Sequence, residues 1–502
     1  FEHVSDADWI VEAVVERIDI KHGIYKKIFD KRKKDSIVSS NTSTIPLKVL
    51  SEKLKAEDKK DFCITHFFNP VRYMGLLEIV RDKLNDQNKI NYLKDFSEEK
   101  YIDYVLACQP LILGYSDPDV NKAITNQLKK GSTFSLHNKL EIDVAKMLIS
   151  TVPSAEMVRF GKNGADVTTI AVRIARAVTG RNHIAYCGYH GWHDWYIANT
   201  DLNSGIPDFN KKLAHSFNYN DLNSLENIFK KNPNKIACVI MEPLTILEPA
   251  CYGPKNCKNK KCNNFCQKNF LSEVKKMAHH YGALLIFDEI ITGFRFSLGG
   301  AQELTGVTPD LATFAKAISN AVPLSAVVGK KEYMSELKKT FFSFTYGGDC
   351  IGLAAAKACI PKLKRENVAG HLNIVGKELK KGFNDLASIH NLNEFIECIG
   401  YPCRTVISFN GQGKYNDLEI KSYFQQELLR RGVLWAAYHS LSWSHKSKQI
   451  KKTLQAFDEI MGLFKKIHTN SLNLRNKIEG IPVRPVFRKV ADFNYYTRKN
   501  NK

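Results

Sequence analysis

Two residues able to hold an aldehyde cofactor lie in apolar surroundings, about one strand-helix-strand unit apart. Asp288 follows the apolar run in "ALLIFDE", and Lys316 stands among small and apolar neighbours in "LATFAKAISNA". Taken alone, Asp288 can cap the next turn and Lys316 can be a solvated surface residue. Together they indicate pyridoxal phosphate chemistry, because a desolvated lysine can form a Schiff base and an aspartate can pair with a pyridinium nitrogen.

Two further stretches supply what the phosphate and the ring of that cofactor need. "GKNGADVTT" indicates a glycine turn that opens a helix, so that backbone N–H groups at Gly164 and Ala165 are available to an anion. "YHGWHD" follows a predicted strand and offers Tyr189 as an aromatic plate. We therefore predict a site for pyridoxal 5'-phosphate built from these three residues with Lys316 and Asp288.

The elements around these residues predict a large α/β domain with a mainly parallel sheet. "KIACVIMEP", "ALLIFDE", "DLATFAKAI" and "SAVVG" are predicted strands, since continuous apolar runs are typical of parallel strands buried on both faces. "DPDVNKAITNQLKKG" predicts a helix with Asp117 as its N-cap and Gly131 past its end. After about residue 360, helices alternate with short strands, which predicts a smaller α+β C-terminal domain.

These stretches carry a family resemblance over residues 100–468. "YIDYVLA", "TGRNHIAYCGYHGWHD", "LLIFDEIITGFRF", "GVTPDLATFAKAISNAVPLSAVVG" and "FSFTYGGD" resemble the class III (subgroup II) aminotransferases, most closely glutamate-1-semialdehyde aminomutase and related sugar-cluster transaminases. The resemblance implies PLP fold type I, a homodimer with shared active sites, and transfer of an amino group from a small-molecule donor to a carbonyl acceptor. Whether the transfer joins two molecules or is an aminomutase reaction stays open.

The same resemblance implies a role for each site residue. Lys316 is the Schiff-base lysine and Asp288 is the partner of the pyridinium nitrogen. The other implied cofactor contacts are Tyr189 stacked on the ring, Gly164 and Ala165 at the phosphate, Glu242 of "VIMEP" beside the cofactor, and Thr345, which reaches the phosphate of the neighbouring subunit. The implied domains are 100–360 for cofactor binding and 361–468 for the small domain, followed by a basic tail at 469–502.

This sequence departs from the family pattern at several positions. Ala165 stands where the family has Ser or Thr, so one hydroxyl contact to the phosphate is lost. Ala317 and Ala321 replace usual glycines, and "CQP" at 108–110 replaces a Gly-Pro. The family segment that precedes "YIDY" is not found. The resemblance therefore identifies the cofactor and leaves the amino donor and acceptor unnamed.

The first 98 residues form a separate pattern of strands and helices. "DADWIVEAVVE", "SIVSSNTST" and "FCITHFFNP" are predicted strands, and Ile20, Ile24 and Ile28 form the apolar stripe of an intervening helix. This alternation predicts a doubly wound, Rossmann-like parallel sheet. Ligands of such sheets bind at the carboxyl ends of the strands, where Ser43 and His66 lie.

"SSNTSTIPL" and "HFFNPVRYMGLLEIV" resemble the NAD-binding domain of the 3-hydroxyacyl-CoA dehydrogenases. The resemblance implies His66 as general base, Glu78 as the residue that orients it, and Ser43 as a hydrogen-bonding partner of the substrate oxygen. Glu16 and Lys21 match the positions that touch NAD. The family's Gly-rich turn and helical second domain are not found, so we expect residues 1–98 to be a partial domain without dehydrogenase activity.

Charge and apolar pattern limit the remaining classes of function. The net charge of +21 leaves open a non-enzymatic, basic binding protein, but the lysines are scattered and no nucleic-acid-binding motif accompanies them. No apolar run reaches the roughly 20 residues of a membrane span. We therefore expect neither nucleic acid nor membrane as a partner. Cysteines within the apolar stretches "FCITHFF" and "KIACVIM" indicate buried reduced thiols and a cytoplasmic location.

A basic insertion, "CYGPKNCKNKKCNNFC", contains Cys251, Cys257, Cys262 and Cys266. Four thiols can bind zinc. The spacing lacks paired C-x-x-C knuckles, so we expect free or redox-active thiols and no metal. The two family patterns meet at Glu98–Lys100 with no linker composition between them.

Overall fold

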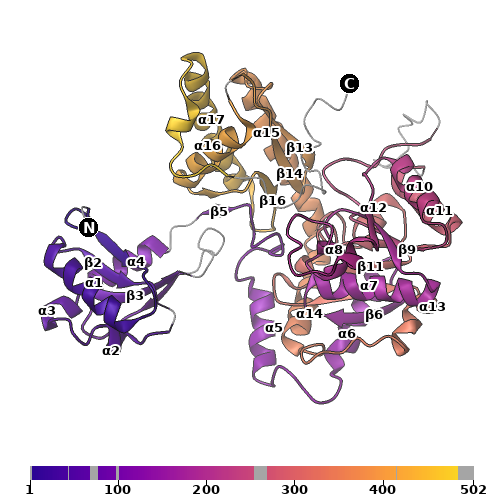
Figure 1. The fold of residues 1–502 in the computed structure, drawn as a ribbon, viewed down its shortest axis with the longest axis horizontal. Coiled ribbons are helices and arrows are strands. Elements are labelled where there is room, and N and C mark those ends of the chain that lie inside the picture. The colour runs from indigo at the N-terminus through magenta and orange to yellow at the C-terminus, as the bar shows by residue number, and fades with distance from the viewer. Residues whose placement is uncertain are drawn as a thin grey trace. The chain divides into compact units, whose positions relative to one another are not determined.

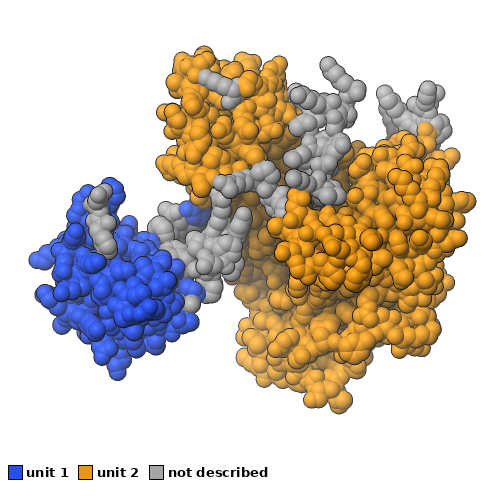
Figure 2. All heavy atoms as spheres, in the orientation of Figure 1, with its two compact units in different colours: residues 1–101 blue, residues 102–502 orange. Residues whose placement is uncertain are grey.

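The computed structural model describes residues 3–42, 44–67, 77–97, 101–253, 268–413 and 415–483. The chain forms two compact units, unit 1 at Phe1–Tyr101 and unit 2 at Ile102–Lys502 (Figures 1 and 2). The predicted seam at Glu98–Lys100 lies outside the described residues.

Unit 1 is a four-stranded sheet with helices. Its strands, in spatial order, are β1 (Trp9–Glu12), β2 (Ile37–Ser40), β3 (Phe62–Phe67) and β4 (Leu77–Val80). Its helices are α1 (Ile18–Lys31), α2 (Leu47–Leu50), α3 (Ala56–Lys59) and α4 (Gln87–Ser97). The first three strands are parallel and β4 is antiparallel to β3. Tyr25 and Ile28 of α1 pack with Val38 and Phe62 in the core, as the predicted Rossmann-like fold requires.

A seven-stranded sheet forms the larger part of unit 2, in the order β6-β12-β11-β10-β9-β7-β8. The strands are β6 (Met157–Gly161), β7 (His183–Cys187), β8 (Ala214–Ser216), β9 (Ile236–Met241), β10 (Leu284–Asp288), β11 (Leu311–Phe314) and β12 (Ser325–Gly329). Within this sheet β12 is antiparallel to both neighbours, and the remaining pairs are parallel. The predicted mainly parallel α/β sheet is confirmed.

Both faces of this sheet are buried, because alternate strand residues enter different core clusters. Leu285 and Phe287 of β10 pack in the cluster that includes α11 (Phe270–His280) and α14 (Cys350–Arg365), whereas Ile286 packs in the cluster that includes α7 (Gly164–Thr179). The helices are α5 (Pro118–Leu128), α6 (Lys139–Thr151), α7 (Gly164–Thr179), α8 (Asp194–Ile197), α9 (Asp208–Lys211), α10 (Leu222–Lys231), α11 (Phe270–His280), α12 (Ala301–Thr305), α13 (Lys331–Met334) and α14 (Cys350–Arg365), with 3-10 helices η1 (Lys316–Ser319) and η2 (Ser335–Lys338).

The C-terminal part of unit 2 is a smaller antiparallel sheet with three long helices. The sheet has the order β13 (Ile396–Tyr401), β14 (Arg404–Phe409) and β16 (Tyr438–Ser440). The helices are α15 (Val368–Ile389), α16 (Asp417–Arg430), α17 (Ser447–Thr469) and the 3-10 helix η3 (Leu474–Lys477). β5 (Ile102–Asp103) pairs with β15 (Val433–Leu434), so the start of unit 2 is hydrogen-bonded to its C-terminal part.

The predicted helix cap at Asp117 and the predicted turn before the helix at Gly164 are both confirmed. The Asp117 side chain accepts hydrogen bonds from the backbone N–H groups of Asp119 and Val120 at 3.1 and 3.3 Å, so it caps α5 as predicted. Gly164 is the first residue of α7 and follows the turn after β6, which is the predicted order of strand, turn and helix. Over the described ranges, no helix combines the length and the apolar content needed to cross a bilayer.

Gly376 of α15 sets how closely this helix approaches the turn between β13 and β14. A Cβ there would lie 1.9 Å from the carbonyl oxygen of Pro402, whereas a Cβ on Gly462 of α17 would meet His390 Cε1 at an ordinary 3.5 Å. We expect Gly376→Ala to lower the free energy of unfolding by about 1–3 kcal/mol through overpacking. The control Gly462→Ala should raise it by up to ~1 kcal/mol through helix propensity. Urea unfolding of both variants checks this, and equal effects would contradict the described contact.

Candidate active site

The carboxyl ends of parallel strands gather the predicted cofactor residues at one edge of the large sheet. Strands β7, β9, β10 and β11 are parallel neighbours. The residues at or just beyond their carboxyl ends are Tyr189 and His190 after β7, Glu242 after β9, Asp288 closing β10 and Lys316 after β11. Ligands of open α/β sheets bind at this edge. Four residues predicted from separate stretches of sequence therefore lie at the same edge.

Asp288 is buried and its carboxylate is held by three donors. Its Oδ2 accepts from His190 Nδ1 at 2.8 Å, since a carboxylate oxygen can only accept. Its Oδ1 accepts from the backbone N–H of Ile290 at 3.1 Å and from Thr313 Oγ1 at 3.3 Å. The carboxylate is thus fixed in orientation, which suits a group that must face one nitrogen of a ring.

His190 is the positioning residue that the sequence analysis missed. The side chain is fully buried, and its backbone carbonyl accepts from Thr168 Oγ1 of α7 at 2.8 Å. The ring lies near Trp195, with centroids 6.2 Å apart and planes 16° apart. Its Nε2 is buried and has no hydrogen-bond partner among the described residues. The signal was present, because His190 directly follows Tyr189 in the loop at the end of β7, a strand that pairs with β9.

Lys316 has an amine suited to covalent chemistry near neutral pH. Burial lowers the pKa of Lys316 to about 8, and the positive charge of Arg404 adds to this effect. The carboxylates of Glu242 and Asp288 act in the opposite direction, so all three charges are within electrostatic reach of the amine. The residue also adopts φ +51°, a left-handed conformation that non-glycine residues seldom take outside functional or turn positions.

Glu242 joins the ends of β7 and β9. Its Oε1 accepts from the backbone N–H of Tyr189 at 2.7 Å. Gly188 permits this contact, because its φ is +109° and a Cβ there would lie 2.9 Å from Glu242 Cγ. The ring of Tyr189 lies edge-on to Tyr196, with centroids 5.5 Å apart. The loop that carries Tyr189 and His190 is therefore fixed to the neighbouring strand.

The start of α7 offers the backbone N–H groups that an anion needs. Asp166 accepts from the backbone N–H groups of Lys162 and Asn163, at 3.2 and 2.7 Å, which fixes the turn before the helix. A Cβ on Gly191 would lie 2.8 Å from Cβ of Ala165, so the tyrosine loop packs against this helix start. Helix N-termini attract phosphate through their N–H groups and dipole. The departure at Ala165 removes a hydroxyl and leaves these backbone groups.

These residues fit pyridoxal phosphate as a set. An amine of lowered pKa, a fixed carboxylate, an aromatic side chain and a helix N-terminus would hold the aldehyde, ring nitrogen, ring face and phosphate, respectively. The fit rests on the buried donors around Asp288 and on the buried, unpartnered Nε2 of His190.

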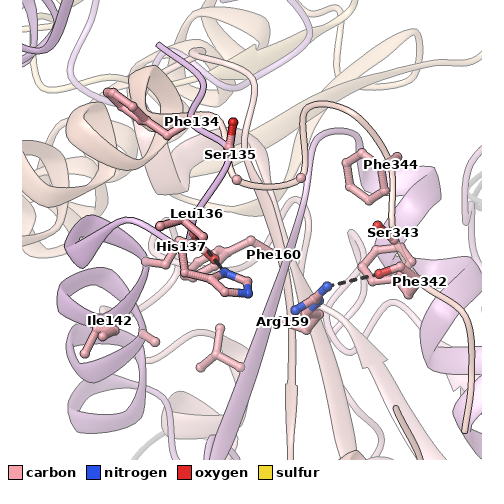
Figure 3. A pocket seen from close by; sticks show the side chains of 15 residues that line it. Phe134, Ser135, Leu136, His137, Ile142, Arg159, Phe160, Phe342, Ser343 and Phe344 are labelled. Atoms are coloured by element: carbon pink, nitrogen blue, oxygen red, sulfur yellow. Dashed lines mark hydrogen bonds and ion pairs between the residues drawn. The ribbon is translucent and has the colours of Figure 1, made fainter. Parts of the chain in front are cut away.

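Thr345 lies elsewhere, on an exposed loop before α14. The loop borders an open hollow of about 640 Å³, lined among others by Leu136, Phe160, Phe342 and Phe344 (Figure 3). Leu136 is 84% exposed and Phe344 is 36% exposed. No contact among the described residues brings Thr345 to Lys316, so within one chain these two predicted site residues are not brought together.

In unit 1, the backbones of His66 and Glu78 are directly opposite in the β3–β4 register, and the roles predicted for the two side chains stay predictions. Ser43 lies outside the described residues. Lys21 is fully buried, with Nζ 2.9 Å from Glu12 Oε1 and 3.8 Å from Glu16 Oε2. Glu12, which the sequence analysis gave no role, is thus the main partner of Lys21.

The cysteine insertion falls largely outside the description. Cys251 is exposed and unpaired with another cysteine, whereas Cys257, Cys262 and Cys266 are not among the described residues. The expectation of free thiols and no metal stays a prediction.

Comparisons with known proteins agree with the two-unit organisation. The profile of the family "Aminotransferase class-III" matches residues 83–461, and the profile "3-hydroxyacyl-CoA dehydrogenase, NAD binding domain" matches residues 1–102. The chain is 36% identical over 389 residues to a 3-aminobutyryl-CoA aminotransferase of Cloacimonas acidaminovorans (strain Evry), covering 76% of this chain and 89% of that protein. It is 30% identical over 438 residues to a glutamate-1-semialdehyde 2,1-aminomutase of Methanocaldococcus jannaschii, covering 82% and 98%.

Solved structures have the same fold, and one of them contains the expected cofactor. The FumI protein of Sphingopyxis sp. MTA144, solved in its PLP internal aldimine form, is 25% identical with a TM-score of 0.65, covering 75% of this chain and 87% of that one. An omega-transaminase from Sphaerobacter thermophilus is 24% identical with a TM-score of 0.64, covering 72% and 86%, and shows the fold alone. The predicted family, fold type and cofactor are confirmed.

The lowered pKa of Lys316 predicts selective labelling in protein stripped of cofactor. Only a neutral amine undergoes reductive methylation, and a group of pKa about 8 is half neutral at pH 8. A lysine of ordinary pKa, roughly 10.4, is still almost fully protonated there. We expect the labelling rate of Lys316 to reach half its maximum near pH 8, measured by peptide mass spectrometry over a pH series. The exposed lysines are the internal control, and a midpoint for Lys316 that coincides with theirs would contradict the assignment.

Proposed function

Because the chain belongs to the class III aminotransferases, we propose that it transfers an amino group between a 3-aminoacyl thioester and an oxo acid, with Lys316 as the catalytic lysine. One observation carries the proposal: Lys316, with its pKa lowered to about 8, lies at the strand edge where His190 fixes Asp288. The family and the cofactor are established, and the substrate class and the residue roles are the proposal.

Each residue of the edge would have a role in holding the cofactor. Lys316 Nζ would bind its aldehyde carbon, Asp288 would accept from its ring nitrogen, and Tyr189 would cover the ring. Gly164 and Ala165 would offer backbone N–H groups to the phosphate. Glu242, which already accepts from the Tyr189 N–H, would lie beside the cofactor.

The chemistry divides between the cofactor and the chain. When bound, pyridoxal phosphate supplies an aldehyde that captures amines and a ring that withdraws electrons. Lys316 Nζ would accept the proton from the substrate carbon that bears the nitrogen. Asp288, oriented by His190 and Thr313, would face the ring nitrogen.

The proposed substrate class is supported by one relative and one family model, both of which are named for an acyl-CoA with a polar group at C3. The Cloacimonas relative is named for an acyl-CoA with an amino group at C3, and the domain that unit 1 matches is named for an acyl-CoA with a hydroxyl group at C3. Oxidation of either C3 group gives a 3-oxoacyl thioester. A single chain with both folds is thus suited to 3-substituted acyl thioesters. The alternative is an aminomutase, as in the Methanocaldococcus relative.

The experiment measures amino transfer directly. With 3-aminobutyryl-CoA and 2-oxoglutarate we expect 3-oxobutyryl-CoA and glutamate in equal amounts. Lys316→Ala should lower the rate roughly 10³-fold or more, as loss of a covalent catalyst does, and should abolish the covalent cofactor adduct left by borohydride. Lys331→Ala, an exposed lysine at the start of α13, is the matched control. Turnover of glutamate-1-semialdehyde alone, with none of the thioester, would establish the aminomutase instead.

Unit 1 gives a second candidate, an NAD-dependent 3-hydroxyacyl-CoA dehydrogenase. The observation that favours it is the His66–Glu78 register pair. The same preparation, incubated with NAD and 3-hydroxybutyryl-CoA, should reduce NAD if unit 1 is active, and His66→Ala should remove that reduction while leaving amino transfer intact. Wild-type protein that transfers amino groups but leaves NAD oxidised would exclude this second activity.

We propose further that the protein is a cytoplasmic homodimer in which Thr345 serves the neighbouring subunit. Buried free thiols such as Cys187, Cys238 and Cys359 support a reducing location. The exposed apolar side chains around the hollow near Thr345 support a partner surface, since isolated proteins seldom expose large apolar patches. A two-fold interface makes each contact occur twice, so the Thr345 loop of each subunit would face the active-site edge of the other.

Charges placed in this hollow should separate the subunits. We expect wild-type protein to sediment as a dimer and the double variant Leu136→Glu with Phe344→Glu to sediment as a monomer, because carboxylates would be buried without partners. Ile374→Glu, at a 69% exposed position on α15, is the control and should stay dimeric. A double variant that remains dimeric at micromolar concentration would place the interface elsewhere.

A further inference from the structure

Asn320 closes the 3-10 helix that begins with Lys316. Its backbone N–H donates to the carbonyls of Lys316 and Ala317, and its own conformation is left-handed, with φ +50°. The side chain is 6% exposed, and both ends of its amide are bonded. Oδ1 accepts from the backbone N–H of Leu113 at 2.9 Å, and Nδ2 donates to the carbonyl of Gly114 at 3.0 Å. The turn that carries Lys316 is therefore fixed to a segment 207 residues earlier in the chain.

These two hydrogen bonds allow only one orientation of the amide. A backbone N–H can pair only with the side-chain oxygen, and a backbone carbonyl can pair only with the side-chain nitrogen. Leu113 is 2% exposed, so loss of the amide would leave a buried N–H without a partner. Because both partners are backbone groups of one short segment, a shift of that segment would move Asn320 and the turn with it.

This segment belongs to a strap, residues 104–114, that also contacts the C-terminal part of unit 2. The backbone N–H of Trp443 donates to the carbonyl of Ile112 at 2.8 Å, and Ser444 Oγ donates to the carbonyl of Leu113 at 2.9 Å. Trp443 and Ser444 lie between β16 and α17. Gly114 permits the approach, because its φ is +94° and a Cβ there would lie 2.1 Å from Ser444 Oγ. The strap is thus bonded to the lysine turn and to the C-terminal part.

Two observations show that the strap is held in one conformation. The four successive residues 106–109 have φ values from +50° to +85°. Non-glycine residues persist in this conformation only where the surrounding structure over-determines it. Arg295 supplies part of that constraint, because its Nη2 donates to the carbonyl of Gln109 at 2.8 Å and its Nη1 donates to the carbonyl of Leu441 at 2.6 Å. The same guanidinium therefore joins the strap to the segment that follows β16.

The C-terminal part also contributes a charge to the surroundings of Lys316. Arg404 opens β14, is 7% exposed and acts on Lys316 through its charge. Burial lowers the pKa of Arg295 to about 10, and the charge of Arg404 adds to that effect, so the two guanidinium groups are near each other. The separation of Lys316 and Arg404 therefore depends on how the C-terminal part is placed on the large sheet, and the strap joins those two parts.

We propose that Asn320 is a positioning residue for Lys316, which couples the placement of the C-terminal part of unit 2, through the strap, to the position of the Lys316 amine. The proposal rests on the proposed function in that Lys316 is the group that reacts. A shift of Trp443 and Ser444 moves the strap, and the strap moves the turn that begins at Lys316. Proton transfer needs close alignment of the amine and the carbon, so a displacement of about 1 Å is enough to change its rate.

Asn320→Gly tests this coupling, because glycine keeps the left-handed backbone and removes both hydrogen bonds. The half-reaction of the cofactor-loaded protein is followed by cofactor absorbance, with whichever of 3-aminobutyryl-CoA and alanine reacts with wild type. We expect the rate at saturating donor to fall about 10- to 100-fold, and the half-saturating donor concentration to stay near its wild-type value. Asn391→Gly, at an exposed left-handed asparagine after α15, is the matched control and should match wild type in both. A wild-type rate for Asn320→Gly would overturn the proposal.

Ser444→Ala tests the link between the strap and the C-terminal part. The variant removes the hydroxyl that donates to the carbonyl of Leu113. Alone, it should slow the same half-reaction a few-fold. Combined with Asn320→Gly, it should cause no further slowing, because the strap then no longer reaches the lysine turn. Effects that multiply in the double variant would show that the two residues act independently and would overturn the coupling.

Two measurements on the full chain without cofactor test the position of the lysine turn directly. The amide of Leu113 should exchange its hydrogen faster in Asn320→Gly and stay protected in Asn320→Asp, which retains the acceptor oxygen. The labelling midpoint of Lys316 should move to higher pH in Asn320→Gly, because burial is the main cause of its lowered pKa and a displaced turn buries the amine less. A midpoint that stays near pH 8 would show that the amine has not moved and would contradict the positioning role.

The aspartate variant and the wild-type activity keep failures apart. In the half-reaction, Asn320→Asp should recover part of the rate lost in Asn320→Gly, which guards against a glycine variant that does not fold. If wild-type protein transfers no amino group, the proposed function fails and the labelling of Lys316 still decides the role of Asn320. If wild-type protein does react and Asn320→Gly matches it in rate and labelling, the positioning role fails alone.

Discussion

The site depends on one constraint, the free-energy cost of burying charged groups at the edge of a sheet that is covered on both faces. Water cannot satisfy groups placed there, so each must be paired by the chain or by what binds. The chain pairs Asp288 with His190 and gives Glu242 the Tyr189 N–H. Among the described residues, the buried Nε and Nη1 atoms of Arg404 have no hydrogen-bond partner. The groups that are paired orient a ligand, and the groups that are not paired attract one.

The sequence predicted those parts of the active site that depend on residues close together in the chain. Apolar runs ending in a carboxylate located β9 and β10, and the lysine among small residues located Lys316. A glycine turn before an apolar helix located the start of α7. These signals are visible because each depends on residues within a few positions of one another. Membership of a parallel sheet then brought them to one edge without further information.

The contacts that cross between elements could not be predicted in this way. His190 approaches Asp288 only because β7 and β10 flank β9, an order that the chain does not reveal by itself. Arg404 comes from a different sheet, more than a hundred residues after Asp288, and nothing around "PCRTV" marks it as part of the site. Likewise, Lys21 was predicted from the resemblance to touch NAD, and its pairing with Glu12 across β1 and α1 emerged only with the fold.

The closeness of Arg404 and Arg295 has a consequence for selectivity. The two guanidinium groups make a region of positive potential in a low-dielectric interior, and Glu242 and Asp288 reduce that potential at the Lys316 amine. An amine with a second positive charge, such as a diamine, would be repelled from it, whereas a zwitterionic amino acid would be drawn in with its carboxylate foremost. The same residues that favour a zwitterionic donor thus disfavour a diamine, so charge discriminates between amine donors in addition to shape.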